Sequence, residues 1–309
     1  MIILVTGAGG MVGRHFLADE RAGAHVILAP RRAELDLTDA GACAAYVARE
    51  KPDLIVHLAA VVGGIQANID APTRFLADNL ALGLNVLTAA QAAGVPRLIN
   101  MGSSCMYPKD APGLLTEDRL LSGPLEPTNE GYALAKIAIA RLGQAMRREN
   151  PGAHYVTLIP PNLYGPFDHF DLVRSHLPPA AIMKVEAAVR VGDRTVEIWG
   201  DGTARREFMF AGDLADFLWR VHDRLETLPP ILNVGVGEDH TVREYYEVVA
   251  RAAGYDGAFV YNPAKPTGML RKLLDVSGQR RLGWSPPTGL EDGIAATLAY
   301  YRSVATSAT

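Results

Sequence analysis

Residues 2–13 decide the fold of this chain, and they read IILVTGAGGMVG. Residues 2–5 form a continuous aliphatic run, which is typical of a central strand in a parallel sheet. The glycines that follow, spaced Gly-x-x-Gly-x-x-Gly, permit a tight turn and close approach of backbone N–H groups to a pyrophosphate. A helix is expected over about residues 14–22. With a plain loop as the alternative, this order of strand, turn and helix predicts a dinucleotide site formed by Gly7, Gly10, Met11, Val12 and Gly13.

The residues after the second predicted strand, at 25–29, indicate which dinucleotide binds. An NAD site usually offers a carboxylate to the ribose 2′-hydroxyl, whereas an NADP site offers arginine to the 2′-phosphate. Here Arg31 and Arg32 follow directly, and the competing carboxylate of Glu34 lies farther from the strand end. The sequence therefore favours NADP(H), with solvated surface charges as the alternative interpretation of the two arginines.

Strands and helices continue to alternate along the first half of the chain. Strands are expected at 53–58, 97–101 and 154–159, and helices at 71–93 and 132–148. This alternation predicts an α/β fold with a Rossmann-type doubly wound parallel sheet. Beyond residue 165 the predicted elements become shorter, with a helix near 213–225. We therefore expect an NADP-binding domain over 1–165, to which later segments return, and mainly a smaller C-terminal α/β substrate-binding domain over 166–309.

A second stretch, GSSCMYP at 102–108, brings two hydroxyls and a thiol to the end of a predicted strand. Tyr132 and Lys136 follow on one face of a predicted helix, because they are four residues apart. A neighbouring ammonium lowers a tyrosine pKa from its usual value of about 10. A serine hydroxyl such as that of Ser103 can bind a carbonyl oxygen while the tyrosine transfers its proton. The pattern predicts reduction of a carbonyl or oxidation of an alcohol, although a Tyr-x-x-x-Lys pair also occurs on helices by chance.

Two other features indicate an anionic ligand in the same cleft. Asn162 follows the strand predicted at 154–159, and ligands of open α/β sheets bind at the carboxyl ends of strands. Arg205 and Arg206 are adjacent, and guanidinium groups bind phosphates in bidentate fashion. A surface ion pair with Glu207 is the alternative for these arginines.

Composition excludes several classes of protein. The chain has 309 residues and a formal net charge of −4, so it lacks the basic excess expected of a nucleic-acid-binding protein. Two cysteines, Cys43 and Cys105, cannot form a disulfide framework and suggest a reducing compartment. We find neither a signal-peptide pattern nor an apolar stretch that would span a membrane. A cytoplasmic protein without a metal site is expected.

Longer motifs extend over nearly the whole chain. They read GMVG at 10–13, LDLTD at 35–39, AVVGGI at 60–65, GSSCMYPK at 102–109, LEPTNE at 125–130, NLYGP at 162–166, SH at 175–176, REF at 206–208 and RKLLD at 271–275. With these motifs the chain resembles the GDP-L-fucose synthase family of the extended short-chain dehydrogenase/reductases. The segment Gly-Ser-Ser-Cys-x-Tyr-Pro-Lys is highly specific, whereas the glycine motif and Tyr-x-x-x-Lys are shared by the whole superfamily.

The resemblance implies NADPH-dependent 3,5-epimerisation and 4-reduction of GDP-4-keto-6-deoxy-D-mannose to GDP-L-fucose. It also implies a homodimer joined through a four-helix bundle of the helices near 72–93 and 132–149. A reductase triad of Ser103, Tyr132 and Lys136 and an acid/base pair of Cys105 and His176 are expected. The cofactor contacts would be the glycine-turn residues named above together with Arg31, Arg32, Asp36, Leu37, Leu58, Ala59, Ala60, Tyr132, Lys136, Asn162, Leu163 and His176. The sugar nucleotide would contact Ser104, Asn162, Lys184, Trp199, Arg206 and Lys272.

Three single positions and one segment depart from the family pattern. The segment DLVR at 171–174 differs from the usual asparagine-rich version. Lys184 stands where arginine is frequent, Pro161 replaces a threonine, and Gly9 replaces an arginine of some members. Two alternatives stay open. The chain could be a related nucleotide-sugar 4-reductase/epimerase for another keto-sugar, or a non-catalytic NADP(H)-binding sensor, for which an intact triad would be unnecessary.

Overall fold

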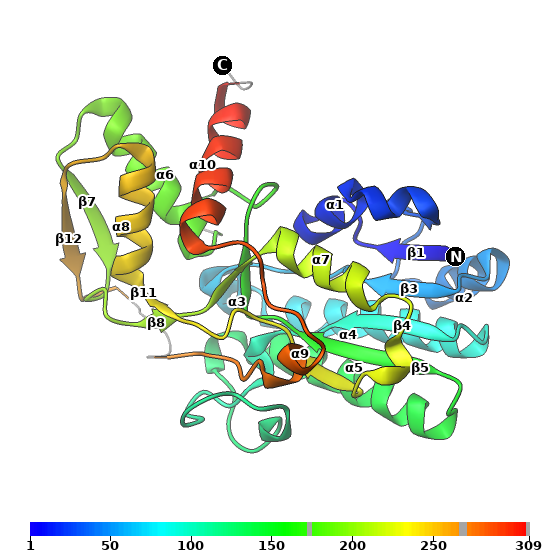
Figure 1. Ribbon diagram of the computed structural model, residues 1–309. Helices are drawn as coiled ribbons and strands as arrows, with labels where there is room; N and C mark the ends of the chain where they lie inside the picture. Colours follow the sequence, from blue (N-terminus) through cyan, green and yellow to red (C-terminus); the bar gives the residue numbers. More distant parts are fainter. Residues whose placement is uncertain (172–174, 266–270, 307–309) are drawn as a thin grey trace.

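The computed structural model describes residues 1–171, 175–265 and 271–306, so residues 172–174 of the segment DLVR lie outside it. A parallel sheet lies at its centre (Figure 1) and has six strands. The strand order is β10-β5-β4-β3-β1-β2, so the chain reverses direction across the sheet between β2 and β3. This confirms the predicted doubly wound parallel sheet. The strands are β1 (Ile2–Thr6), β2 (Val26–Leu28), β3 (Leu54–His57), β4 (Arg97–Met101), β5 (His154–Ile159) and β10 (Ile231–Asn233).

Helices cover both faces of this sheet because successive strand residues point to opposite sides. Ile3 and Val5 face the layer of α1 (Met11–Ala18) and α7 (Ala211–Val221). Leu4 belongs to the core on the other face. That face is covered by α2 (Ala40–Glu50), α4 (Pro72–Ala92) and α5 (Glu130–Glu149), and the short α3 (Ile65–Asp70) precedes α4. The core is therefore two-layered, with β1 buried between the layers.

Two predicted helices end earlier than expected. Helix α1 stops at Ala18 because Asp19 is extended and its side chain accepts the backbone N–H of Arg21, which starts a 3₁₀ turn over Glu20–Ala24. Helix α7 ends at Val221, and a separate 3₁₀ turn follows at Leu225–Thr227. The second strand is likewise shorter than 25–29.

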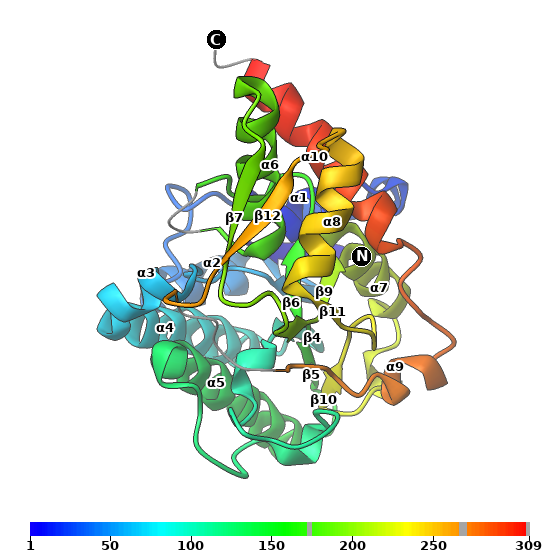
Figure 2. The ribbon, with the colours of Figure 1, turned by 90° about the vertical axis from the view of Figure 1, so that its left-hand side faces the viewer.

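A second lobe stands beyond the carboxyl edge of the sheet (Figure 2). It contains α6 (Leu177–Val191), α8 (Val242–Ala253) and α10 (Leu290–Thr306), which share one apolar core with the parallel pair β7 (Thr195–Trp199) and β12 (Ala258–Asn262). Two further pairs join the lobes: β6 (Asn162–Tyr164) with β9 (Phe208–Phe210), and β8 (Arg205–Arg206) with β11 (His240–Thr241). Helix α9 (Ser277–Arg281) returns to β10. The chain thus passes between the two lobes repeatedly.

No helix within residues 1–171, 175–265 and 271–306 is long and apolar enough to cross a membrane. In the same residues, no three His, Cys, Asp or Glu side chains gather as they would around a metal ion.

Candidate active site

A cleft of about 1870 Å³ lies between the carboxyl edge of the sheet and the second lobe. Typical sites for one small molecule have about 300–1,000 Å³, so this cleft has room for two ligands together. Its walls include the glycine turn, the ends of β3 and β4, the start of α5 and the inner face of the second lobe. All the predicted site residues line it except Ser104 and Arg205. The prediction that Arg205 binds the anionic ligand is wrong for the protein alone, because its guanidinium group is paired with Asp239 instead. Ser104 is only 2% exposed, and its backbone N–H donates to the Pro160 carbonyl.

The glycine turn fits the pyrophosphate of a dinucleotide. Gly7 has φ +72°, and a Cβ there would stand 2.6 Å from the backbone nitrogen of Ala59. A Cβ on Gly13 would stand 2.6 Å from Ala8, so both glycines are needed to pack β1, α1 and the end of β3 together. Gly10 caps α1 without a side-chain hydrogen bond to its first turn. The free N–H groups of that turn face the cleft and can bind an anion.

Arg31 and Arg32 lie at the adenosine end of the cleft expected for such a dinucleotide, and both carry carboxylate partners. Arg31 lies 3.4 Å from Glu34 and Arg32 lies 3.6 Å from Asp36, with all four side chains largely exposed. The backbone N–H of Arg31 also donates to Glu34, and these bonds hold the pKa of Glu34 below its usual value. Exposed ion pairs contribute little, so a phosphate can displace these carboxylates from the guanidinium groups.

Helix α5 places Tyr132 and Lys136 on one face beside the end of β4. The ammonium of Lys136 donates to the carbonyl of Met101 at 2.8 Å and lies 5.7 Å from the centre of the Tyr132 ring. Burial lowers the pKa of Lys136 to about 8. Burial also raises the pKa of Tyr132, and only its hydrogen bond with Ser103 opposes this effect. The expected lowering of the tyrosine pKa by lysine is therefore wrong for the protein alone, because Lys136 binds a carbonyl and desolvation dominates.

Cys105 lies in a 3₁₀ turn, Ser104–Met106, whose start is capped by the Ser103 hydroxyl. Two donors reach its sulfur: the Asn129 amide at 3.3 Å and the Lys272 ammonium at 3.6 Å. Both donors stabilise negative charge on a sulfur that has lost its proton. His176 lines the same cleft from the N-terminal end of α6, and burial together with the Lys272 charge lowers its pKa. The two predicted acid/base residues thus come from different lobes.

The second lobe contributes the predicted nucleotide contacts. Trp199 is 46% exposed, so its ring is available for stacking. Lys184 donates to the Glu197 carbonyl at 3.0 Å and lies 5.1 Å from the centre of the Trp199 ring. Burial lowers the pKa of Lys184 and of Arg206. An aromatic ring, a lysine and a half-buried arginine in one wall suit a nucleoside diphosphate.

The sequence did not reveal three further residues of the cleft. Asn129 lies inside the LEPTNE motif, and no role is predicted for it from the sequence. Its position just before the helix that carries Tyr132 is the feature that indicates a place in the site. Lys265 brings a second ammonium to 5.3 Å from the centre of the Trp199 ring. Asp168 lines the cleft, burial raises its pKa to about 7, and one of its carboxylate oxygens is buried without a hydrogen-bond partner in the described part of the chain. These last two depend on tertiary packing that no local pattern records.

Comparison with known proteins gives consistent results. Residues 3–235 match the model of the NAD dependent epimerase/dehydratase family. GDP-L-colitose synthase of Yersinia pseudotuberculosis is 49% identical over 97% of this chain and 98% of that protein. GDP-L-fucose synthase of Azorhizobium caulinodans is 48% identical, with 97% and 96% covered. A solved structure of a GDP-mannoheptose C4 reductase from Campylobacter jejuni with NADP bound superposes with a TM-score of 0.87 at 29% identity, covering 97% of this chain and 98% of that chain.

Proposed function

Because the chain belongs to the NAD dependent epimerase/dehydratase family, we propose that it converts GDP-4-keto-6-deoxy-D-mannose to GDP-L-fucose. The reaction combines epimerisation at C3 and C5 with NADPH-dependent reduction at C4. One observation carries the proposal: the Ser103, Tyr132 and Lys136 set and the Cys105 and His176 pair line a single cleft. Reduction alone needs only the Ser103, Tyr132 and Lys136 set. The Cys105 and His176 pair is therefore available for a further proton transfer.

The residues of the cleft suit both steps. A ketone at C4 acidifies the protons at C3 and C5, so an acid and a base can invert these centres through enolates. Cys105, held by Asn129 and Lys272, and His176 are the proton donors and acceptors for this step. When bound, NADPH supplies the hydride that reduces C4. Tyr132 gives its proton to the C4 oxygen, and Ser103 holds that oxygen by a hydrogen bond.

Binding divides between the lobes in this proposal. Residues 1–165 hold NADP(H) by the glycine turn, Arg31 and Arg32. Residues 166–309 mainly hold the GDP-sugar, with Arg206 and Lys272 near the diphosphate and Trp199 near the base. The chemistry of the wall supports this division, because guanidinium and ammonium groups bind phosphate oxygens and an exposed indole stacks on a base.

A second candidate is reduction of a different GDP-linked keto-sugar. The relative named GDP-L-colitose synthase matches this chain at 49% identity and favours it. The departures at Lys184 and Pro161 fall in the cleft wall, where they bear on the sugar more than on the proton transfers.

The test is to incubate the protein with NADPH and GDP-4-keto-6-deoxy-D-mannose and to identify the sugar product by NMR. GDP-L-fucose is the expected product. No turnover of this substrate, with NADPH oxidised when a different GDP-linked keto-sugar is supplied, points to the second candidate. Binding of NADPH without any turnover of keto-sugars would mean a cofactor sensor.

We also infer a homodimer and a cytoplasmic location. Leu76 and Leu84 on α4 and Leu134 on α5 are exposed, and the two helices pack side by side. Their outer apolar faces are suited to a four-helix bundle with a second copy.

The cytoplasmic location is inferred from Cys105. Its proposed role needs a free thiol, which a reducing compartment preserves.

A further inference from the structure

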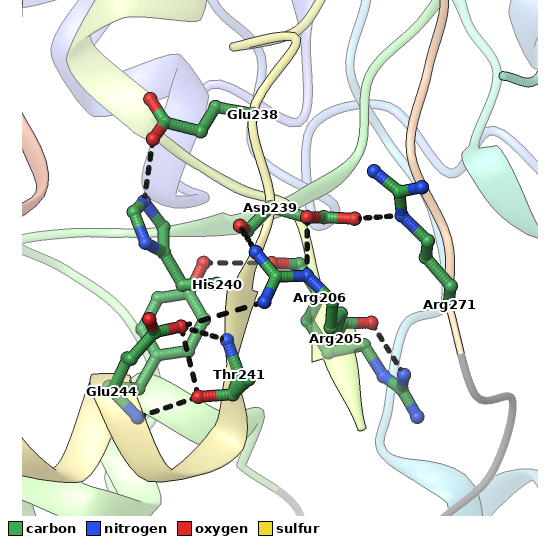
Figure 3. A network of polar contacts seen from close by, with 9 residues as sticks. Arg205, Arg206, Glu238, Asp239, His240, Thr241, Glu244 and Arg271 are labelled. Carbon is green, nitrogen blue, oxygen red and sulfur yellow. Dashed lines mark hydrogen bonds and ion pairs between the residues drawn. The ribbon is translucent and has the colours of Figure 1, made fainter. Parts of the chain in front are cut away.

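Asp239 joins two arginines from distant parts of the second half of the chain (Figure 3). One carboxylate oxygen accepts from Arg205 Nε at 2.7 Å, and the other accepts from Arg271 Nε at 2.5 Å. The Asp239 side chain is only 3% exposed. Burial alone would raise the pKa of Asp239, but the contacts with the two arginines outweigh it and hold the pKa below its usual value, so the carboxylate is charged at neutral pH. A buried carboxylate shared by two guanidinium groups fixes both of them in place.

Each of these arginines is followed in sequence by a residue of the cleft wall. Arg206 lines the cleft and Lys272 lines it too, whereas Arg205 and Arg271 do not. Arg205 and Arg206 form β8, and successive residues of a strand point to opposite sides. Holding Arg205 on Asp239 therefore turns Arg206 toward the cleft. Holding Arg271 places Lys272 where its ammonium lies 3.6 Å from the Cys105 sulfur.

A neighbouring carboxylate holds the backbone of the same segments. Glu207 is 2% exposed and accepts the backbone N–H groups of Val236, Gly237 and Leu274 at 2.7, 2.9 and 2.9 Å. Glu207 thus holds backbone segments next to one another, whereas the Asp239 carboxylate binds the side chains of Arg205 and Arg271. Loss of the Asp239 charge should therefore leave the lobe folded and change the placement of side chains.

We propose that Asp239 is a positioning residue that sets Lys272 against Cys105 and Arg206 toward the diphosphate end of the cleft. The inference rests on the proposed function for the chemistry that it serves, but not for the contact itself. Arg205 and Arg271 carry two positive charges that Asp239 keeps away from the cleft. Without that carboxylate Arg271 loses its ion pair, and Lys272 loses the side-chain contact that holds its neighbour. Arg205 keeps weaker contacts, because it also donates to the backbone carbonyl of Asp239 and lies 4.0 Å from Glu244.

The first measurement needs no substrate. Iodoacetamide alkylates Cys105 at a rate that mass spectrometry can follow. Because the thiolate is the reactive form, this rate depends on whether the Lys272 ammonium lies beside the sulfur. Cys43 is an internal control, since it is 1% exposed and burial raises its pKa to about 11. Lys272→Gln removes the ammonium 3.6 Å from the sulfur and so sets the lower limit of the rate, which we expect to be severalfold below that of the parent. Asp239→Asn should approach that rate. Glu247→Gln is the control variant, because it removes only the exposed ion pair with Arg243 on α8. Its Cys105 should be alkylated at the rate of the parent.

The second measurement is solvent-deuterium exchange at the sugar carbons of GDP-4-keto-6-deoxy-D-mannose. Asp239→Asn should lower it about 10²-fold, the usual scale for a misplaced catalytic group, with NADPH affinity unchanged. If the parent exchanges nothing while Asp239→Asn still slows alkylation, the proposed function fails and the positioning role stands. If Asp239→Asn does not fold, Arg271→Gln removes the Lys272 anchor through a half-exposed side chain and should slow alkylation in the same way. Parental alkylation in a folded Asp239→Asn or Arg271→Gln variant would overturn the inference.

Discussion

Cys105 and Tyr132 lie in one cleft, and the proposed chemistry gives them separable tasks. Cys105→Ser should slow solvent-deuterium exchange at the sugar carbons, because a hydroxyl is a far weaker proton acceptor than a thiolate. Tyr132→Phe should instead abolish reduction while exchange continues. Each loss should be about 10²–10⁴-fold. Deuterium incorporation by mass spectrometry and NADPH oxidation by absorbance measure the two steps side by side. Exchange at parental speed in Cys105→Ser would make the cysteine a bystander.

Arg31 and Arg32 should decide the preference between cofactors, because only NADPH carries the 2′-phosphate that guanidinium groups bind. Replacing both with glutamine should raise KM for NADPH far more than KM for NADH. Their partners Glu34 and Asp36 remain in place, so the local fold keeps its other contacts. Steady-state kinetics with each cofactor make the comparison. Equal changes for the two cofactors would contradict the assignment.

Lys136 should make stability depend on pH. Its pKa is about 8 in the folded protein against a usual 10.5, so the unfolded chain binds more protons between these values. Unfolding free energy therefore rises with pH across that window, and the penalty for the buried charge is fully present below pH 8. Without cofactor, the parent should gain roughly 2 kcal/mol between pH 7 and pH 9.5 relative to Lys136→Met. Urea unfolding of both proteins measures this, and parallel pH profiles would refute it.

The sequence predicted which residue types meet in the cleft better than it predicted their electrostatics. Tyr132 and Lys136 share a helix face, as their spacing indicated. The pKa of Tyr132 nevertheless rises, since the surroundings that bury it come from elsewhere in the chain. The contact between Lys272 and Cys105 also depends on the tertiary fold, because it joins residues 167 positions apart. Only the family resemblance predicted that both residues lie in the site.

At the scale of elements, the glycine turn should tolerate a methyl group at one position and reject it at another. A Cβ on Gly13 would meet Ala8 at 2.6 Å, whereas a Cβ on Gly9 meets nothing within 4 Å. Gly13→Ala should push α1 away from the end of β1 and lower the free energy of unfolding by about 1–3 kcal/mol. It should also weaken NADPH binding. Gly9→Ala is the matched control and should bind like the parent. Thermal unfolding and cofactor titration of both variants test this difference.

Element boundaries were less predictable than element types. Every strand expected in the first half is present, because continuous aliphatic runs mark central parallel strands. Helix α1 ended early because a single side chain, Asp19, captures a backbone N–H and redirects the chain. The short pairs β6–β9 and β8–β11 have two or three residues per strand and depend on partners far along the chain, so no local periodicity marks them.

For the whole molecule we predict a dimer through α4 and α5. Leu84→Glu together with Leu134→Glu places charges on the outer faces of these helices, where burial in an interface would be costly. The double variant should sediment as a monomer at micromolar concentration, while the parent sediments as a dimer. Val191→Glu, at a side chain 72% exposed on the second lobe, is the control and should remain dimeric. A monomeric parent would exclude this assembly.

The repeated passage of the chain between the lobes bears on how this enzyme family can be re-engineered. The second lobe is assembled from α6 and β7, then α8 and β12, and finally α10, with α7, β10 and α9 returning to the main sheet in between. A single crossover therefore cannot exchange the second lobe between relatives as one continuous segment. A working chimera has to transplant three separate segments with their shared core. New sugar specificity is more readily reached by point changes in the cleft wall than by recombination.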